Sequence, residues 1–169
     1  DTYALANNDP ESTLKTAAYV KQGPTEVKAG EELTLIGQVM HGLSGVKRVE
    51  YWVREVTDHS KPLGDTDPEL IAAPWIPCEW ESQPNWEAVL PHGVRSQDLL
   101  GFDSKTGQPL AWPPRYGMGS YFAIIRGLKQ GRYEIRARAV DLNGYAQPEP
   151  RPQLKSGRNG IQLWKVKVV

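Results

Sequence analysis

Histidines, cysteines and paired carboxylates are the side chains that could bind a metal or move protons in a sequence of this kind. The three histidines, His41, His59 and His92, lie far apart and form neither a His-x-His nor a His-x-x-x-His pair. A zinc site gathers closely spaced histidines and cysteines around one ion. The histidine spacing therefore gives no sign of a metal site.

Nucleophilic catalysis has equally little support. Cys78 is the single cysteine, which rules out an internal disulfide, and its neighbour Glu79 has the wrong charge to lower a thiol pKa. The serines before Gly45 and Gly157 lack the Gly-x-Ser-x-Gly pattern of a nucleophile elbow. No phosphate loop or dinucleotide-binding fingerprint is present either. We therefore expect no catalytic, metal-binding or cofactor-binding residues in this chain, and a packed, unreactive Cys78.

Composition excludes further classes of partner. The chain has 169 residues, with 20 basic and 20 acidic side chains and a formal net charge of +0. It thus has no overall attraction to nucleic acid or anionic lipid. No apolar run approaches the roughly 18 residues of a membrane span, and no secretory leader pattern opens the chain. With 39% hydrophobic residues, a single domain with an ordinary core is expected.

Alternating apolar and polar residues predict an all-β protein. The 16 glycines and 14 prolines favour a fold rich in turns, and no helix of three turns is evident. About seven short strands separated by turn signals predict an immunoglobulin-like antiparallel β-sandwich over residues 14–169, preceded by a polar linker or arm at 1–13. The strands are expected within 14–22, 29–42, 44–56, 85–90, 119–128, 132–140 and 160–169.

The strand that begins at Arg132 has the clearest period of two. It should direct Tyr133, Ile135, Ala137 and Ala139 inward, and Glu134, Arg136 and Arg138 outward. In the last strand, Trp164, Val166 and Val168 share one face. Ile161 and Leu163 fall on the opposite face, which predicts a bulge or a sheet face that is also buried.

Two local motifs are expected to shape the ends of that strand from Arg132. Leu128, Gly131 and Tyr133 form the Leu-x-x-Gly-x-Tyr spacing of a tyrosine corner, in which the hydroxyl bonds to upstream backbone. Asp141 is expected to cap the turn made by Asn143 and Gly144. Both features predict structural roles.

Residues 57–115 interrupt the regular spacing. This segment holds nine of the 14 prolines and four of the six tryptophans, Trp75, Trp80, Trp86 and Trp112. Disordered segments are poor in aromatic residues, so we expect an ordered insertion, irregular apart from the short strand at 85–90. Its composition suits the core of a protein interface or a surface on which sugar rings stack, and does not choose between them.

Several short motifs together resemble the C-terminal domain of sulfite oxidase-type molybdenum oxidoreductases. They are Ala139-Val140-Asp141, Gln147-Pro148, and Gly157, Asn159 and Trp164 leading into a Val-rich strand. "GLSGVKRVEYWV" is similar to a Gly-rich turn and strand of that domain, and "NWEAVL" to its Trp-x-x-Ala-x-Leu strand. The resemblance covers about residues 24–169, and the long insertion departs from it.

The resemblance implies an immunoglobulin-like domain that makes the homodimer of a periplasmic or otherwise extracytoplasmic enzyme. In that family the molybdopterin and the cysteine that ligates its metal belong to a separate, preceding domain, and Cys78 matches no ligand motif. The implied partners are a second copy of the chain or a molybdenum catalytic domain. The open alternative is a β-sandwich binding module for carbohydrate or protein that uses the insertion's tryptophans.

Association is expected to use the insertion and the stretch before the last strand. Aromatic residues and arginines dominate the energetics of protein interfaces. The family's C-terminal domain lies close to the oxyanion substrate channel, so an arginine could also reach a neighbour's anionic pocket. The candidate interface or substrate-channel residues are Trp112, Arg115, Arg151, Arg158, Asn159 and Trp164, with Arg115 and Arg158 foremost among the arginines.

Overall fold

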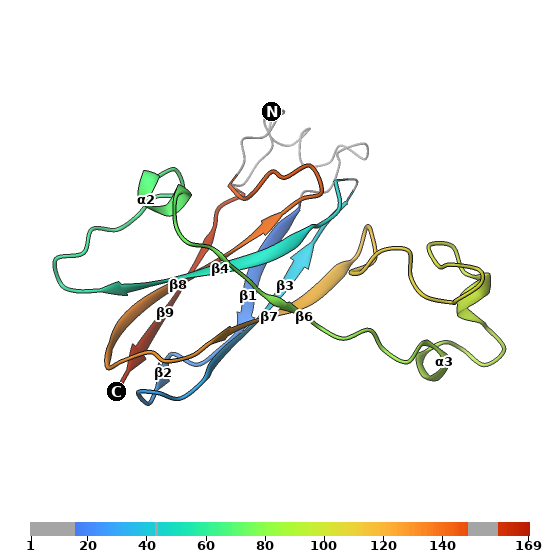
Figure 1. Cartoon of the computed structure of the whole chain (residues 1–169), viewed down its shortest axis with the longest axis horizontal. Coiled ribbons are helices and arrows are strands. Elements are labelled where there is room, and N and C mark those ends of the chain that lie inside the picture. The colour runs from blue at the N-terminus through green and yellow to red at the C-terminus, as the bar shows by residue number, and fades with distance from the viewer. Residues whose placement is uncertain (1–15, 43, 149–158) are drawn as a thin grey trace, which may run out of the picture.

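Two packed β-sheets form a sandwich in the computed structural model, which describes residues 16–42, 44–148 and 159–169 (Figure 1). One sheet has the strand order β1-β3-β7-β6, and the other has the order β2-β9-β8-β4-β5. The predicted fold class is therefore confirmed, whereas the expected linker at 1–13 lies outside the described residues. The strands are β1 (Ala17–Gln22), β2 (Glu26–Val27), β3 (Leu33–Met40), β4 (Arg48–Val56), β5 (Ile76–Pro77), β6 (Glu79–Trp80), β7 (Met118–Ile125), β8 (Gly131–Val140) and β9 (Gln162–Val168).

The inner faces of the two sheets make the main core. In β3 every second residue is buried, from Leu33 to Val39, and the same alternation runs through β7. Gly37 is required at its position because a side chain there would overlap the ring of Tyr121 from the neighbouring strand. As the sequence predicts, Tyr133, Ile135, Ala137 and Ala139 of β8 point into this core.

The two turns predicted around β8 are present. The hydroxyl of Tyr133 donates to the carbonyl of Lys129 at 3.0 Å, which makes the tyrosine corner. At the far end, Oδ1 of Asp141 accepts from the backbone N–H of Asn143 at 2.8 Å and of Tyr145 at 2.9 Å. Gly144 has a φ of 90°, a conformation that a residue with a side chain adopts only under strain. These contacts fix where β8 begins and ends.

The outer face of the five-stranded sheet is covered by the first part of the insertion. Residues 57–75, which include helix α2 (Pro68–Ile71), lie over it and form a second hydrophobic cluster with the sheet. This explains the parity of Ile161, which packs in that cluster, since β8 and β9 pair without a register shift. The five-stranded sheet is therefore buried on both of its faces, and no bulge is needed. The cluster consists of Trp52, Leu63, Leu70 and Ile161, with Ala73 and Trp75 against it.

The outward residues of β8 have the predicted parity but not the predicted exposure. Arg136 is only 5% exposed, because the covering segment lies on it and the carbonyl of Leu63 accepts from its Nη2 at 2.9 Å. Glu134 and Arg138 are half-buried under the same layer. A strand pattern shows which side a residue faces, and a distant segment decides whether that side meets water.

The prediction of a strand at 85–90 is wrong. Residues Trp86–Val89 form the short helix α3 instead. The side chain of Asn85 accepts from the backbone N–H of Glu87 at 3.1 Å, which is the contact of a helix N-cap. An N-capping residue directly before the apolar pattern favours a helical turn over a strand in this short stretch.

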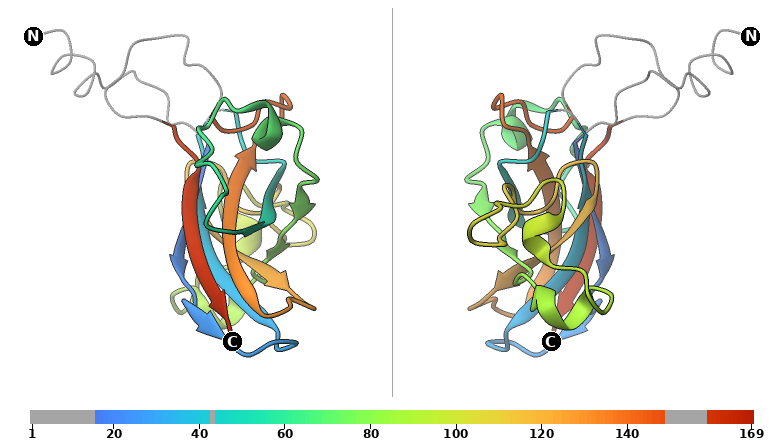
Figure 2. Two further views of the ribbon diagram at one scale, coloured as in Figure 1. Left: turned by 90° about the vertical axis from the view of Figure 1, so that its left-hand side faces the viewer. Right: turned by 90° about the vertical axis from the view of Figure 1, so that its right-hand side faces the viewer.

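Residues 76–80 cross from one sheet to the other and close the edge of the sandwich. β5 pairs with β4, and β6 pairs with β7. Cys78 lies between them, and its backbone N–H donates to the carbonyl of Val49 at 2.8 Å. The chain then leaves the sandwich and projects as an arm with α3, which faces the viewer in the right-hand view of Figure 2. No helix among the described residues is long and apolar enough to cross a membrane.

Replacing Tyr133 by Phe removes only the hydroxyl of the tyrosine corner. We expect the free energy of unfolding to fall by about 1 kcal/mol, the usual net worth of one hydrogen bond. Urea denaturation followed by circular dichroism measures this. Tyr145→Phe is the matched control, because that ring is 62% exposed. Equal stability of the two variants would contradict the assigned role.

Candidate interaction surface

The arm, residues 81–117, is ordered around Trp86. The ring of Trp86 makes edge-to-face contacts with Phe102 at 4.9 Å and with Trp112 at 6.0 Å between ring centroids. The indole N–H of Trp112 donates to the carbonyl of Glu81 at 2.9 Å, so the last part of the arm is tied to the first. Aromatic pairs of this geometry add about 0.5–1.5 kcal/mol each beyond the area that they bury.

A compact loop forms the tip of the arm. Oδ1 of Asp103 accepts from the backbone N–H of Lys105 at 2.9 Å and of Thr106 at 2.8 Å, and these bonds lower the pKa of Asp103. The N–H of Leu110 donates to the carbonyl of Gly101 at 2.8 Å, which closes the loop. The arm thus keeps its shape through its own contacts, as the aromatic content of the insertion predicts.

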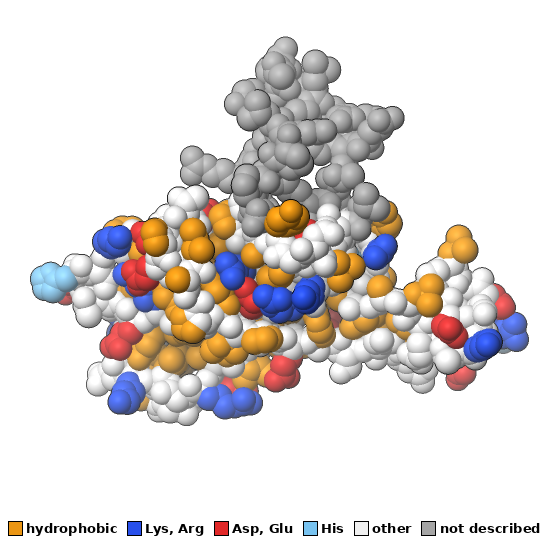
Figure 3. All heavy atoms as spheres, turned by 45° about the horizontal axis from the view of Figure 1, so that its top comes forward, with side chains coloured by type: hydrophobic (Ala, Val, Ile, Leu, Met, Phe, Trp, Pro, Cys, Tyr) orange, Lys and Arg blue, Asp and Glu red, His pale blue; other side chains and the backbone are white. Residues whose placement is uncertain are grey.

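The arm exposes several large apolar side chains. Leu100 is fully exposed, and Leu110 is 71% and Tyr116 67% exposed. Val89 and Val94 are exposed as well. The arm extends well beyond the sandwich, with charged side chains at its far end (Figure 3). These exposed side chains make the arm a candidate surface for a partner.

Two of the predicted interface residues, Trp112 and Arg115, belong to this arm. Trp112 is partly buried and acts inside the arm, whereas Arg115 is exposed. Trp164 lies in the sandwich instead, where it packs against the main core and its Nε1 donates to the carbonyl of Pro24 at 3.0 Å. Asn159 is half-buried just before β9. Arg151 and Arg158 lie outside the described residues.

The insertion's tryptophans are all occupied by internal contacts. The guanidinium of Arg138 lies over the ring of Trp75, 4.1 Å from the ring centroid. The Nε1 of Trp75 donates to the carbonyl of Leu70 at 3.1 Å. Trp80 packs against the main core. Each of these four rings is partly buried. A sugar-stacking platform needs an open ring face, so this arrangement gives the carbohydrate alternative little support.

His41 is buried, which the sequence analysis did not predict. It is 1% exposed at the end of β3, and neither ring nitrogen has a hydrogen-bond partner among the described residues. Burial, and then the nearby charge of Arg115, lower the pKa of His41. The imidazole is therefore neutral at pH 7, beside the place where the arm returns to the sandwich.

Gln147 is the second residue whose role the sequence did not reveal. It is 3% exposed, and its Oε1 accepts from the backbone N–H of Ala18 at 2.7 Å and of Ala139 at 2.9 Å. Its Nε2 donates to the carbonyl of Gly160 at 3.3 Å. One side chain thus joins β1, β8 and the segment that enters β9. Gln147-Pro148 was noted as a motif, but a sequence does not show which backbone groups lack partners.

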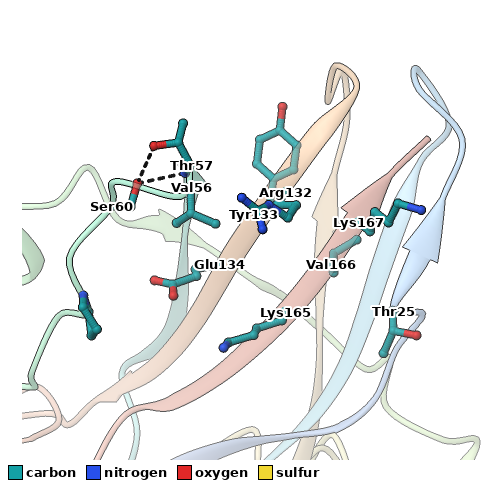
Figure 4. Close-up of a pocket in the computed structure, with 11 residues that line it drawn as sticks. Thr25, Val56, Thr57, Ser60, Arg132, Tyr133, Glu134, Lys165, Val166 and Lys167 are labelled. Carbon is teal, nitrogen blue, oxygen red and sulfur yellow. Dashed lines mark hydrogen bonds between the residues drawn. The ribbon is translucent and has the colours of Figure 1, made fainter.

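A hollow of about 410 Å³ lies on the sandwich at the β8–β9 side, away from the arm (Figure 4). Charged side chains line much of it, but most of them are paired with one another or with neighbours. Arg132 forms an ion pair with Asp58, and Lys167 forms one with Glu26 at 3.3 Å. Glu134 forms an ion pair with Arg54 at 3.6 Å and lies directly opposite Lys165 of β9. With most of its charges paired, the hollow offers no evident catalytic chemistry.

The single cysteine of the chain is poorly suited to ligating a metal. The described residues contain no group of three or more histidine, cysteine or carboxylate side chains placed to hold a metal ion. Cys78 packs against the main core, and burial, followed by the charge of Glu50, raises the pKa of its thiol to about 12. A metal-binding cysteine must present a thiolate, which this environment opposes.

Comparison with known proteins leaves the family open: no protein family model and no curated protein sequence matches this chain.

The burial of His41 predicts a loss of stability in acid. Its pKa in the folded protein lies below the value of about 6.5 expected in the unfolded chain. As the pH falls through 6.5, the unfolded state therefore takes up a proton that the folded state excludes, and the free energy of unfolding decreases until the folded pKa is reached. The slope from this one group is at most about 1.4 kcal/mol per pH unit.

Urea denaturation at a series of pH values measures this effect. His41→Leu should flatten the acid side of the stability curve, whereas His92→Gln should not, because His92 is exposed. Arg115→Gln should flatten it partly, since the Arg115 charge contributes to the shift. Identical pH profiles for the parent and His41→Leu would contradict this account.

Trp112→Ala should loosen the arm while the sandwich stays folded. The variant loses the contact with Trp86 and the hydrogen bond to Glu81, and both lie within the arm. We expect limited proteolysis to cut within residues 81–117 at least about tenfold faster, as a loss of about 1.4 kcal/mol of local stability would produce. Leu100→Ala serves as the control because its side chain contacts solvent. Unchanged cleavage would show that Trp112 does not order the arm.

Proposed function

We propose that this chain is a non-catalytic association domain or subunit of a sulfite oxidase-like molybdenum oxidoreductase. The proposal joins the resemblance of the C-terminal motifs to the fold in which those motifs are found. The observation that supports it most is that the motif residues have structural roles in this domain. They hold the end of an immunoglobulin-like sandwich together, and they leave the arm as the projecting surface.

Gln147 and Asp141 show this use most clearly. Gln147 satisfies two backbone N–H groups from different strands, and Asp141 satisfies two in the turn after β8. Burying these N–H groups without an acceptor would cost about 1–3 kcal/mol each. Trp164 likewise serves packing and one backbone bond. The residues that carry the resemblance therefore have structural roles. Residues of this kind are the ones that we expect an association domain to share with its relatives.

The proposal places the molybdopterin in a separate catalytic domain or subunit. This chain would then contribute binding surface, and its buried Cys78 thiol would take no part in the redox chemistry. By the same resemblance, the assembly would work in the periplasm or another extracytoplasmic compartment. The partner surface is the arm, whose exposed apolar side chains and Arg115 suit an interface.

The experiment compares this chain with the assembly to which it belongs. The coding sequence upstream of Asp1 and the proteins that co-purify with the chain should include a molybdopterin-binding domain. Metal analysis should find stoichiometric molybdenum in that assembly and none in the isolated chain, and sulfite-to-acceptor activity should follow the molybdenum. Molybdenum in the isolated chain, or an assembly without any molybdenum protein, would overturn the proposal.

Glycan affinity electrophoresis tests the alternative directly. If the chain is an association domain, immobilised polysaccharides should not retard its migration. Retardation that Trp86→Ala or Trp112→Ala abolishes would instead assign the arm to carbohydrate binding.

A further inference from the structure

The hollow beside β8 and β9 has no catalytic arrangement, but it gathers cations on the outer face of the five-stranded sheet. Two rows of directly opposed residues from β4, β8 and β9 cross the sheet there. Four of their six side chains are cationic and one is a carboxylate. The first row is Val56, Arg132 and Lys167, and the second is Arg54, Glu134 and Lys165.

Like charges lie next to each other in this arrangement. Arg132 of β8 is the cross-strand neighbour of Lys167 of β9. Like charges directly opposite each other destabilise a sheet. Lys165 precedes Lys167 by two positions and therefore adds a third positive charge to the same face. Three adjacent cations of this kind favour the approach of an anion.

The carboxylate in these rows does not neutralise Lys165. Glu134 forms its ion pair with Arg54 at 3.6 Å, and both of these side chains are largely buried. Lys165 lies directly opposite Glu134, but it forms an ion pair neither with Glu134 nor with any other carboxylate in the described part of the chain. In Figure 4 the Lys165 side chain extends from β9 toward the segment that carries Ser60. Its ammonium group therefore has no counter-charge there.

The other two lining cations have only exposed partners. Arg132 pairs with Asp58, and Lys167 pairs with Glu26 at 3.3 Å. The side chains of Asp58 and Glu26 are 83% and 58% exposed, and neither residue lines the hollow. Exposed ion pairs contribute little to stability. An anion in the hollow can therefore replace either carboxylate at small cost.

The rest of the lining adds an apolar wall and hydroxyl groups. Val56 and Pro62 supply apolar surface. Oγ of Ser60 accepts from the backbone N–H of Thr57 at 2.9 Å, which leaves the hydroxyl hydrogen of Ser60 available to a ligand. The volume of about 410 Å³ is within the range of pockets that hold small organic molecules. The hollow thus suits an organic molecule with an anionic group.

We propose that the hollow binds a small phosphomonoester. Its phosphate group contacts Lys165, Arg132 and Lys167, and its organic part lies against Val56 and Pro62. A phosphomonoester carries roughly −1.5 to −2 charges at pH 7 and has three strong acceptor oxygens, so one group compensates several cations. A carboxylate brings only a single charge. The site is separate from the arm, so this inference goes beyond the proposed association function and does not rest on it.

Isothermal titration calorimetry of the chain with glycerol phosphate and with glucose phosphate tests the proposal. At least one ester should bind, glycerol and glucose should not, and binding should weaken as the salt concentration rises. Lys165→Gln should raise the dissociation constant at least about tenfold, because it removes a charge-assisted contact to the phosphate. Lys105→Gln removes the same charge from an exposed position on the arm and should leave the affinity unchanged.

A second variant should change the affinity in the opposite direction. Glu26→Gln removes the exposed partner of Lys167 and should tighten binding about twofold or more, an effect that misfolding cannot imitate. Glu32→Gln is its matched control. Glu32 also forms an exposed ion pair, with Arg126 at 2.7 Å, but neither residue lines the hollow.

Three results would contradict the proposal. If neither ester binds at about 10 mM, which is weaker than millimolar affinity, the site does not exist. Inorganic phosphate that binds as tightly as the esters overturns the assignment to an ester. Equal losses of affinity in Lys165→Gln and Lys105→Gln overturn the placement in the hollow. The proposed function concerns the arm and is tested separately.

Discussion

The outer layer of the protein depends on a buried carboxylate, Glu50 of β4, and on the two arginines that satisfy it. Glu50 is 3% exposed, and its two oxygens accept from Nε of Arg48 and from Nε of Arg138, each at 2.7 Å. Arg138 in turn lies on the ring of Trp75, in the segment that covers the sheet. Removing a partner from a buried charge costs about 3–5 kcal/mol, and the contact of Arg138 with Trp75 links this network of the sheet to its cover. The cover then leads directly into residues 76–80, which close the sandwich and start the arm.

Direct contacts also join the covering segment to the five-stranded sheet. Arg54 of β4 forms an ion pair with Glu69 of α2 at 3.2 Å, and the carbonyl of Leu63 accepts from Nη2 of Arg136 at 2.9 Å. The long insertion is in this sense part of the sandwich, although the sequence presents it as an interruption.

The sequence predicted the features that depend on local pattern. The long strands, the tyrosine corner at Tyr133 and the turn at Asp141 each follow from residue spacing over a few positions. It failed where distant segments decide the outcome. The exposure of Arg136 depends on residues 57–75, and the burial of Gln147 depends on backbone groups from three segments. The helix at 86–89 was mistaken for a strand because four residues are too few for either period to show. Composition indicated an ordered insertion. It could not show that the rings of Trp112 and Trp164, which were predicted to lie in an interface, make contacts within the protein instead.

The pKa shifts of the buried groups separate structure from chemistry in this protein. Catalytic groups are tuned by specific charged partners so that they gain or lose protons near neutral pH. Here burial is the largest cause of the shifts of Cys78, Tyr121 and His41, and in each case it favours the neutral form: the pKa values of the thiol and the phenol are raised, and that of the imidazole is lowered. All three groups therefore stay neutral at pH 7. The motif residues Asp141 and Gln147 bind backbone groups, and exposed apolar side chains such as that of Leu100 lie on the arm. The arm, rather than these buried groups, is therefore the candidate surface for a partner.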